Sequence, residues 1–321
     1  MEVDGETESV LRTALSPSTH GPASGIDDAS SPGRNVANYK DAREAGGARD
    51  HGAAVPGFTR SLVTDPAYGP LQGLLLTLTV VTGVVDAISI LALGRVFVAN
   101  MTGNVAFAAF AVVGAPGFSL SASLFALAGF LLGAYAGGLL ISRFGSDRGL
   151  LLRAGGAVEL AFAAIALVIA ATSGDPGVTH GTIGLNGGEF GAAVTDTLAA
   201  LLAIALGVQN AVARKLAVPD MTTTVLTMTL TGIGADLRTV FVKEGGVRRA
   251  ARTAALAALD RRLLAVAAMV IGAAAGASLA LRVSPVSALA LATALLALVT
   301  AWVTLATRRP ANWRAFPAAK R

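Results

Sequence analysis

Long apolar segments separated by short polar connections dominate the chain from Leu71 onward. Five of these segments reach, or nearly reach, the roughly 17 to 25 residues that a membrane-crossing helix needs. They are Leu71–Leu93, Phe118–Ile141, Leu150–Thr172, Leu263–Leu281 and Pro285–Ala306. A sixth, Leu198–Val212, reaches that length if it begins at about Ala192. The pattern predicts an all-α fold, a polytopic membrane helical bundle.

Two shorter segments, Val96–Val113 and Met221–Val242, carry polar residues and leave the number of crossings open. Cytoplasmic connections of membrane proteins carry an excess of Lys and Arg. The connection Ser142–Arg153 carries three Arg and residues 238–262 carry seven basic residues, whereas residues 173–196 carry none. These charges share one side if both short segments enter and leave the membrane on the same side. We therefore predict eight helical segments, six crossings plus two short re-entrant helices, in a plasma-membrane protein with both termini in the cytoplasm.

Composition separates this helical region from the two ends of the chain. Hydrophobic residues make up 54% of the chain and charged residues 14%, against about 25% charged residues in soluble domains. Residues 1–69 are rich in Gly, Ser, Pro and charge, without a helical or strand period, which predicts a disordered N-terminal tail. Residues 70–306 form the predicted transmembrane helical domain, and residues 307–321 a basic cytoplasmic C-terminal tail.

The residue inventory argues against an enzyme or a cofactor-binding protein. The chain has no Cys, and its three His lie outside the apolar segments, so thiolate chemistry and a buried metal site are not expected. No phosphate-binding loop, zinc-protease or serine-hydrolase motif occurs. The formal net charge is +5, but the basic residues stand between apolar segments, where they set membrane orientation. The expected partners are therefore the lipid bilayer and a small solute or ion, and not a nucleic acid.

The two halves of the helical region look related. Gly83-Val84-Val85-Asp86-Ala87 is similar to Gly207-Val208-Gln209-Asn210-Ala211, and each is followed by a segment that opens with Met-Thr. Gly133-x-x-x-Gly137 has a counterpart in Gly272-x-x-x-Gly276. If each half crosses the membrane three times, an odd number, the halves must be inverted relative to each other. Inverted repeats with discontinuous elements are typical of secondary transporters.

Polar side chains inside the apolar segments are the candidate pathway residues. Asp86 and Glu159 lie well inside their predicted spans, where an ionised carboxylate costs at least ~2.5 kcal/mol. Asn100 and Asn104 are four residues apart and share one helix face. The candidate set for a substrate or ion pathway is Asp86, Asn100, Thr102, Asn104, Glu159, Gln209, Asn210, Thr223 and Thr227. The alternative is that these groups only bond to neighbouring helices or, for the Thr hydroxyls, to their own helix backbone.

Glycines at four-residue spacing form two ridges that we interpret as packing devices. They are Gly129, Gly133 and Gly137 in the first half and Gly272 and Gly276 in the second. Small residues at this spacing let two helix backbones approach closely. The approaching helix can belong to the same chain or to a second copy, so a homo-oligomer stays open.

The block Val98-Ala99-Asn100-Met101-Thr102-Gly103-Asn104, with Gly83–Ala87 before it, resembles the signature of the YoaK-type family of bacterial multi-pass membrane proteins, a domain of unknown function. Gly207–Asn210 and Thr223–Thr227 resemble a second block of that family. The resemblance covers roughly residues 70–306 and implies a membrane location and several helices, but no substrate. On the polar residues, we expect a secondary transporter or channel for a small solute, and the alternative is a non-transporting membrane scaffold or accessory subunit.

Overall fold

Eight α-helices account for most of the chain in the computed structural model, which describes residues 68–173, 190–216, 218, 226–241, 249–308 and 311–316. The helices are α3 Leu71–Ala92, α4 Met101–Val112, α5 Leu120–Phe144, α6 Arg148–Ser173, α7 Ala192–Leu216, α8 Leu226–Phe241, α9 Arg249–Arg282 and α10 Pro285–Ala306. A 3-10 turn, η1, follows at Asn312–Arg314. The predicted N-terminal tail, apart from Tyr68 and Gly69, and the candidate Thr223 lie outside the described residues.

Six of these helices are long and apolar enough to cross a membrane: α3, α5, α6, α7, α9 and α10. The two remaining helices, α4 and α8, are the two short segments, with 12 and 16 residues. The prediction of an all-α helical bundle with six helices long and apolar enough to cross a membrane and two short helices is therefore confirmed. The extension of the fourth span back to Ala192 is also found, because α7 begins there.

Two helix boundaries differ from the predicted ones. The apolar run from Val96 begins its helix only at Met101, because the preceding residues form an irregular connection in which Gly94 and Arg95 both have positive φ angles. The other difference is α9, which starts at Arg249 instead of near Leu263 and spans 34 residues. The mixed Arg and Ala stretch before Leu263 continues the spanning helix, since Ala and Arg are strong helix formers.

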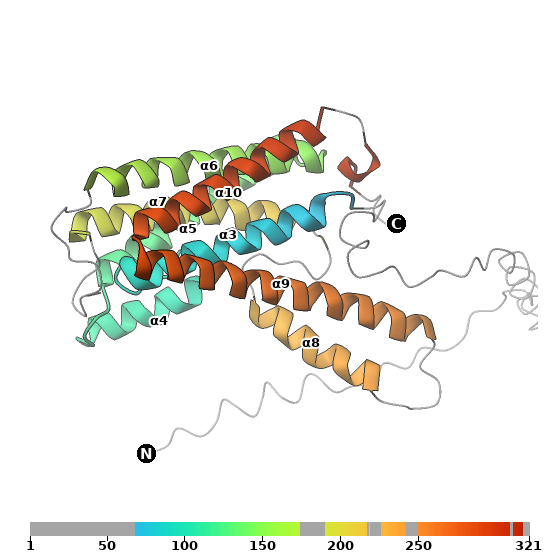
Figure 1. The fold of residues 1–321 in the computed structure, drawn as a ribbon, viewed down its shortest axis with the longest axis horizontal. Helices are drawn as coiled ribbons and strands as arrows, with labels where there is room; N and C mark the ends of the chain where they lie inside the picture. The colour runs from blue at the N-terminus through green and yellow to red at the C-terminus, as the bar shows by residue number, and fades with distance from the viewer. Residues whose placement is uncertain are drawn as a thin grey trace, which may run out of the picture. The chain divides into compact units, whose positions relative to one another are not determined.

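The helices pack side by side in one bundle (Figure 1). Four of them contact one another in turn: α10 contacts both α3 and α6, and α7 contacts α6 and, more weakly, α3. On the flanks, α9 packs along α3 and α5 packs along α7. The short helix α4 lies on α5 and α8 lies on α9, toward opposite ends of the bundle.

This packing has the symmetry of an internal repeat. Exchanging α3, α4, α5 and α6 for α7, α8, α9 and α10 reproduces every one of these helix contacts. The register repeats as well, because a Cβ on Gly272 would lie 2.1 Å from the Val80 carbonyl oxygen and one on Gly133 would lie 2.1 Å from that of Ile204. Val80 and Ile204 are separated by the same number of positions as Gly83 and Gly207, which head the two similar sequence blocks.

The direction of the helices shows that the two halves are inverted. Gly149 faces Thr307 and Gly156 faces Thr300, so the corresponding helices α6 and α10 run antiparallel. Val80 meets Gly272 and Val84 meets Gly276, so α3 and α9 run parallel. A two-fold axis that relates antiparallel helices runs perpendicular to them. In a bilayer, such an axis lies in the plane of the membrane. Inverted-topology repeats have this geometry.

Candidate functional site

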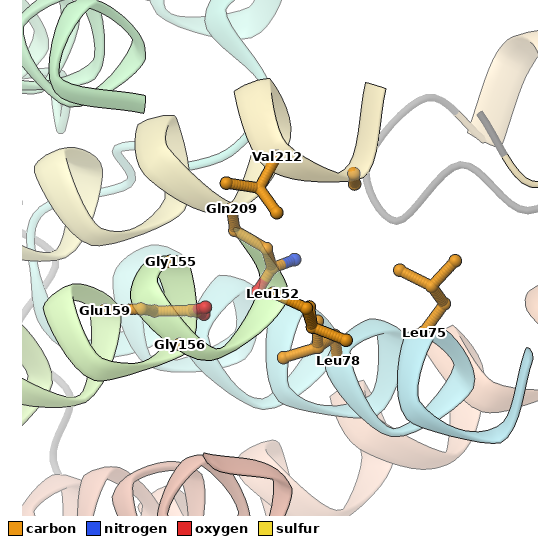
Figure 2. A pocket seen from close by; sticks show the side chains of 9 residues that line it. Leu75, Leu78, Leu152, Gly155, Gly156, Glu159, Gln209 and Val212 are labelled. Carbon is orange, nitrogen blue, oxygen red and sulfur yellow. The ribbon is translucent and has the colours of Figure 1, made fainter. Parts of the chain in front are cut away.

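A small cavity lies between α3, α6 and α7 (Figure 2). Its volume is about 10 Å³, which is close to the minimum that holds one water molecule. Seven of the nine lining residues are Gly, Ala, Val or Leu, and the other two are Glu159 and Gln209. The cavity is therefore an apolar chamber with two polar side chains in its wall.

Glu159 reaches this cavity from the middle of α6 and is only 1% exposed. Its Oε1 atom is buried and has no hydrogen-bond partner among the described residues. Two glycines one turn earlier let the neighbouring helices close around it: a Cβ on Gly155 would lie 2.8 Å from the Val212 side chain, and one on Gly156 would lie 2.9 Å from the Thr300 hydroxyl. The close packing of α7 and α10 on α6 thus removes the carboxyl from lipid.

Gln209 approaches from α7 and ties that helix to α3. Its Nε2 atom donates a hydrogen bond to the Thr82 hydroxyl at 2.9 Å, and Thr82 donates in turn to the Leu78 carbonyl at 3.0 Å. The Oε1 atom of Gln209 is buried without a partner within the described ranges. Gln209 and Thr82 are the polar link across the centre of the repeat, since α3 and α7 are corresponding helices.

The two unpaired polar atoms of this site are hydrogen-bond acceptors. A buried polar atom without a hydrogen bond costs about 1–3 kcal/mol, and two such oxygens, from Glu159 and Gln209, line one cavity. A group that donates hydrogen bonds, or a positive charge, would satisfy both atoms. The site therefore favours a proton, a water molecule or another donor over an anion.

Asp86 and Asn210 occupy corresponding positions, each three residues after the glycine that heads its block. Asp86 is half-buried, and its Oδ1 atom has no hydrogen-bond partner in the described part of the chain. Asn210 donates from Nδ2 to the Leu206 carbonyl at 2.9 Å. Neither residue lines the cavity beside Glu159. The structure thus brings Glu159 and Gln209 together at the cavity and leaves Asp86 and Asn210 outside its lining.

Asn104 has a local structural role. Its Oδ1 atom accepts from the Phe97 backbone N–H at 2.8 Å, and its Nδ2 atom donates to the Phe97 carbonyl. Both ends of the amide are thereby used to fold the connection between α3 and α4. Asn100 and Thr102 are exposed at the start of α4, and the structure does not bring any of the three to the cavity.

The remaining predicted residues lie away from the cavity as well. Thr227 is exposed on α8, and its backbone carbonyl accepts a hydrogen bond from Thr231 at 2.9 Å. The glycine ridges lie at the helix pairs: Gly129, Gly133 and Gly137 face α7, and Gly272 and Gly276 face α3. The ridges pack helices within this chain, so neither ridge is free for a second copy.

One polar cluster was not predicted from the sequence and lies at the end of the bundle where α3 and α6 begin. Arg314 forms an ion pair with Asp147, and its Nη1 atom donates to the Thr307 carbonyl at 3.1 Å. Burial alone would raise the pKa of the Asp147 carboxyl, but the Arg314 hydrogen bond and charge, with backbone N–H donors, hold that pKa below its usual value. Asp147 and Arg314 are far apart in the sequence, and no short sequence motif predicts that they pair.

Aromatic contacts extend this cluster over the ends of α6 and α7. The Arg148 guanidinium lies 5.0 Å from the Phe316 ring centre and 5.4 Å from that of Tyr68, and the Lys215 ammonium lies 5.3 Å from Phe316. Trp313 packs on Gly69, where a Cβ would lie 2.8 Å from the indole. The C-terminal segment, residues 311–316, therefore covers the ends of the helices that line the cavity.

The described residues contain no group of three or more His, Asp or Glu that could hold a metal ion.

Comparison with known proteins gives a family. The profile of "Protein of unknown function (DUF1275)" matches residues 74–302. The chain is 31% identical over 177 residues to the UPF0700 transmembrane protein YoaK of Bacillus subtilis (strain 168), an alignment that covers 54% of this chain and 70% of that protein. No solved structure matches the chain at a significant level. The predicted resemblance to the YoaK-type family is confirmed.

Proposed function

We propose that this chain, which belongs to the DUF1275 family of membrane proteins, is a secondary transporter for a small solute. The observation that carries the proposal is the pair of unpaired oxygens of Glu159 and Gln209 in one cavity, beside the crossing of two inverted halves. In inverted-repeat transporters, the substrate and coupling-ion sites lie near the midplane between the repeats, and the two halves rock against each other around them.

The location of the cavity supports this function. It lies where α7 of the second half meets α3 and α6 of the first half, so a displacement of one half against the other changes its walls. The Gln209–Thr82 hydrogen bond joins the halves at this point. Polar groups inside a membrane protein are expensive and mark solute or ion pathways. A pathway that opens between the halves would pass these groups in turn.

Orientation follows from the charges of the connections. We propose that the protein lies in the plasma membrane with the starts of α3 and α6 and the end of α10 in the cytoplasm, since the basic connections then share that side. The C-terminal segment, with Asp147, Arg148 and Lys215, would lie at the cytoplasmic face.

The rival function is a scaffold or accessory subunit that transports nothing. The cavity has a volume of only about 10 Å³ in this conformation, and a scaffold would also have a small cavity here. A scaffold role gives no reason for the two buried, unpaired Oε1 atoms of Glu159 and Gln209, each of which lowers the stability of the folded protein. For this reason we favour transport.

Flux measurements on purified protein in proteoliposomes test the proposal. Amino acids, sugars and inorganic ions are screened as classes, with and without a pH gradient, for the wild-type protein and for Gln209→Leu. We expect flux of at least one class that falls by about fivefold or more in Gln209→Leu, since uncompensated loss of a buried polar contact costs about 1–3 kcal/mol. Gly138→Ala is the control, because a Cβ there meets no atom within 4 Å. A wild-type protein that moves none of these classes contradicts the proposal.

A further inference from the structure

The cavity beside Glu159 is too small and too poor in oxygen atoms for a metal ion. Divalent cations such as Ca²⁺ and Mg²⁺ take six or more oxygen ligands, and a dehydrated monovalent cation also needs several. Only two side chains in the cavity wall carry oxygen, Glu159 and Gln209, and the volume is about 10 Å³. A proton needs no such shell, because a single carboxylate oxygen binds it.

The charges around Glu159 also favour a bound proton. The elements that pack on α6 or line the cavity carry the following titratable groups: Asp86 on α3, Tyr135 and Arg143 on α5, Arg148 and Arg153 on α6 itself, Asp196, Arg214 and Lys215 on α7, and Arg314 in η1, while α10 carries none. None of these residues lines the cavity. An isolated carboxylate in an apolar interior is so costly that it takes up a proton. Glu159 thus meets no positive side chain that would hold it as an anion in this conformation.

Building on the proposed function, we propose that Glu159 is the proton-carrying residue of this protein and that the proton is its coupling ion. In the conformation described here the Glu159 carboxyl is neutral, and the free Oε1 atom of Gln209, in the wall of the same cavity, is the acceptor for its O–H. On release, the O–H bond breaks, the proton passes to a water molecule that enters the cavity, and a carboxylate remains. The reverse transfer from a hydronium ion restores the acid.

The side-chain amide of Gln209 can form a hydrogen bond with both the protonated and the ionised form of the Glu159 carboxyl. With its Nε2 atom on Thr82, as observed, its Oε1 atom presents an acceptor to a protonated Glu159. Rotation of the amide by half a turn presents the N–H₂ group to a carboxylate instead, while Oε1 then accepts from the Thr82 hydroxyl. A hydroxyl both donates and accepts, so the Thr82 partner is satisfied either way. Gln209 is therefore the positioning residue for the proton on Glu159.

Infrared difference spectroscopy of the purified protein in lipid nanodiscs tests the assignment without any solute. A protonated carboxyl group gives a C=O stretching band that a carboxylate lacks. We expect a band that disappears as the pH is raised from acidic to alkaline, that is missing in Glu159→Gln, and that stays in Asp196→Asn, whose carboxyl lies at an exposed contact with Ser121. Gln209→Leu removes the acceptor, so the band should shift in frequency while keeping its intensity.

Two outcomes overturn the inference. A band that is unchanged in Glu159→Gln belongs to another carboxyl, and a band that persists through the whole pH range marks a permanently neutral, structural acid. If Glu159→Gln does not fold, the absence of a frequency shift in Gln209→Leu overturns the inference instead.

The flux assay separates this inference from the proposed function. In proteoliposomes with an enclosed pH-sensitive dye, solute movement that is accompanied by a pH change in the wild-type protein supports both. Solute movement without any pH change overturns the proton assignment and leaves the transporter intact. A titrating band in a protein that moves no solute overturns the transport proposal and leaves Glu159 as a proton site.

Discussion

At the residue scale, two features stand out among the described residues: buried oxygen atoms without a hydrogen-bond partner, and glycines packed directly against another helix backbone. The Oε1 atoms of Glu159 and Gln209 share a cavity without a donor in the described residues. Four glycines, Gly83, Gly133, Gly207 and Gly272, lie so close to another helix backbone that a Cβ would come within 2.5 Å of a carbonyl oxygen. The first feature is destabilising and suggests function, and the second holds the halves together.

Gly133→Ala tests the backbone contact between α5 and α7. The new methyl group would lie 2.1 Å from the Ile204 carbonyl oxygen, so the helices must separate, and overpacking of this kind costs about 1–3 kcal/mol. We expect a lower thermal unfolding midpoint for the purified protein. Gly138→Ala lies on the same helix with open space around its Cβ and should leave the midpoint unchanged. Equal midpoints for both variants would refute the close crossing.

Sequence reasoning identified some of these residues and missed others. Glu159 and Gln209 were found because polar residues in apolar segments are rare and costly. Thr82 was missed, since a Thr in a membrane helix ordinarily bonds to its own backbone, as Thr82 also does. Asn104 was grouped with the pathway because it shares a helix face with Asn100, but its amide closes a connection with Phe97. A pattern gives the face of a residue but not its partner.

At the scale of elements, the C-terminal segment is the least expected feature. A chain end of mixed Arg, Trp and Pro gives no periodic signal, yet residues 311–316 pack on the start of α6 through Trp313 and Arg314. Since these contacts cover the ends of helices that line the cavity, we expect this segment to restrict access to the cavity from that side.

The Asp147–Arg314 pair gives this segment a pH dependence. Because the folded pKa of Asp147 lies below its usual value, the pair stabilises the docked segment above the unfolded pKa and is lost as the pH falls through the lower folded pKa. We expect Trp313, 7% exposed, to become accessible to a fluorescence quencher only under acid conditions, or at neutral pH in Asp147→Asn. A Trp302→Phe background leaves Trp313 as the sole indole, since the chain has two Trp. Quenching that is unaffected by both changes would refute the docked arrangement.

The short helix α4 decides the number of crossings. With six crossings, both ends of α4 lie on one side of the membrane, so single cysteines at Arg95 and Ala115 should react with an impermeant thiol reagent from the same side. A cysteine at Ser146, between α5 and α6, should react from the opposite side. The chain has no native Cys, so each signal comes from one position. Labelling of Arg95→Cys and Ala115→Cys from opposite sides would establish α4 as a crossing helix.

At the scale of the whole molecule, the inverted repeat is the organising feature. The sequence indicated it through the Gly83 and Gly207 blocks and the two glycine ridges, although few residues are identical between the halves. The structure adds what sequence similarity could not supply: the glycine ridge of each half packs on the similar block of the other half, Gly276 on Val84 and Gly137 on Val208. Each half therefore supplies a glycine ridge that packs on the other half, and only the tertiary structure shows this pairing.

A transport cycle in this fold requires that the Glu159 cavity opens to each side of the membrane in turn. The most direct test places a single cysteine in the cavity wall, Val212→Cys, with Ala292→Cys as a control at a position on α10 that is 0% exposed and outside the cavity lining. In oriented proteoliposomes, an impermeant thiol reagent added to either side should modify Val212→Cys and should leave Ala292→Cys unmodified. A Val212→Cys protein that stays as unreactive as Ala292→Cys from both sides would contradict the account.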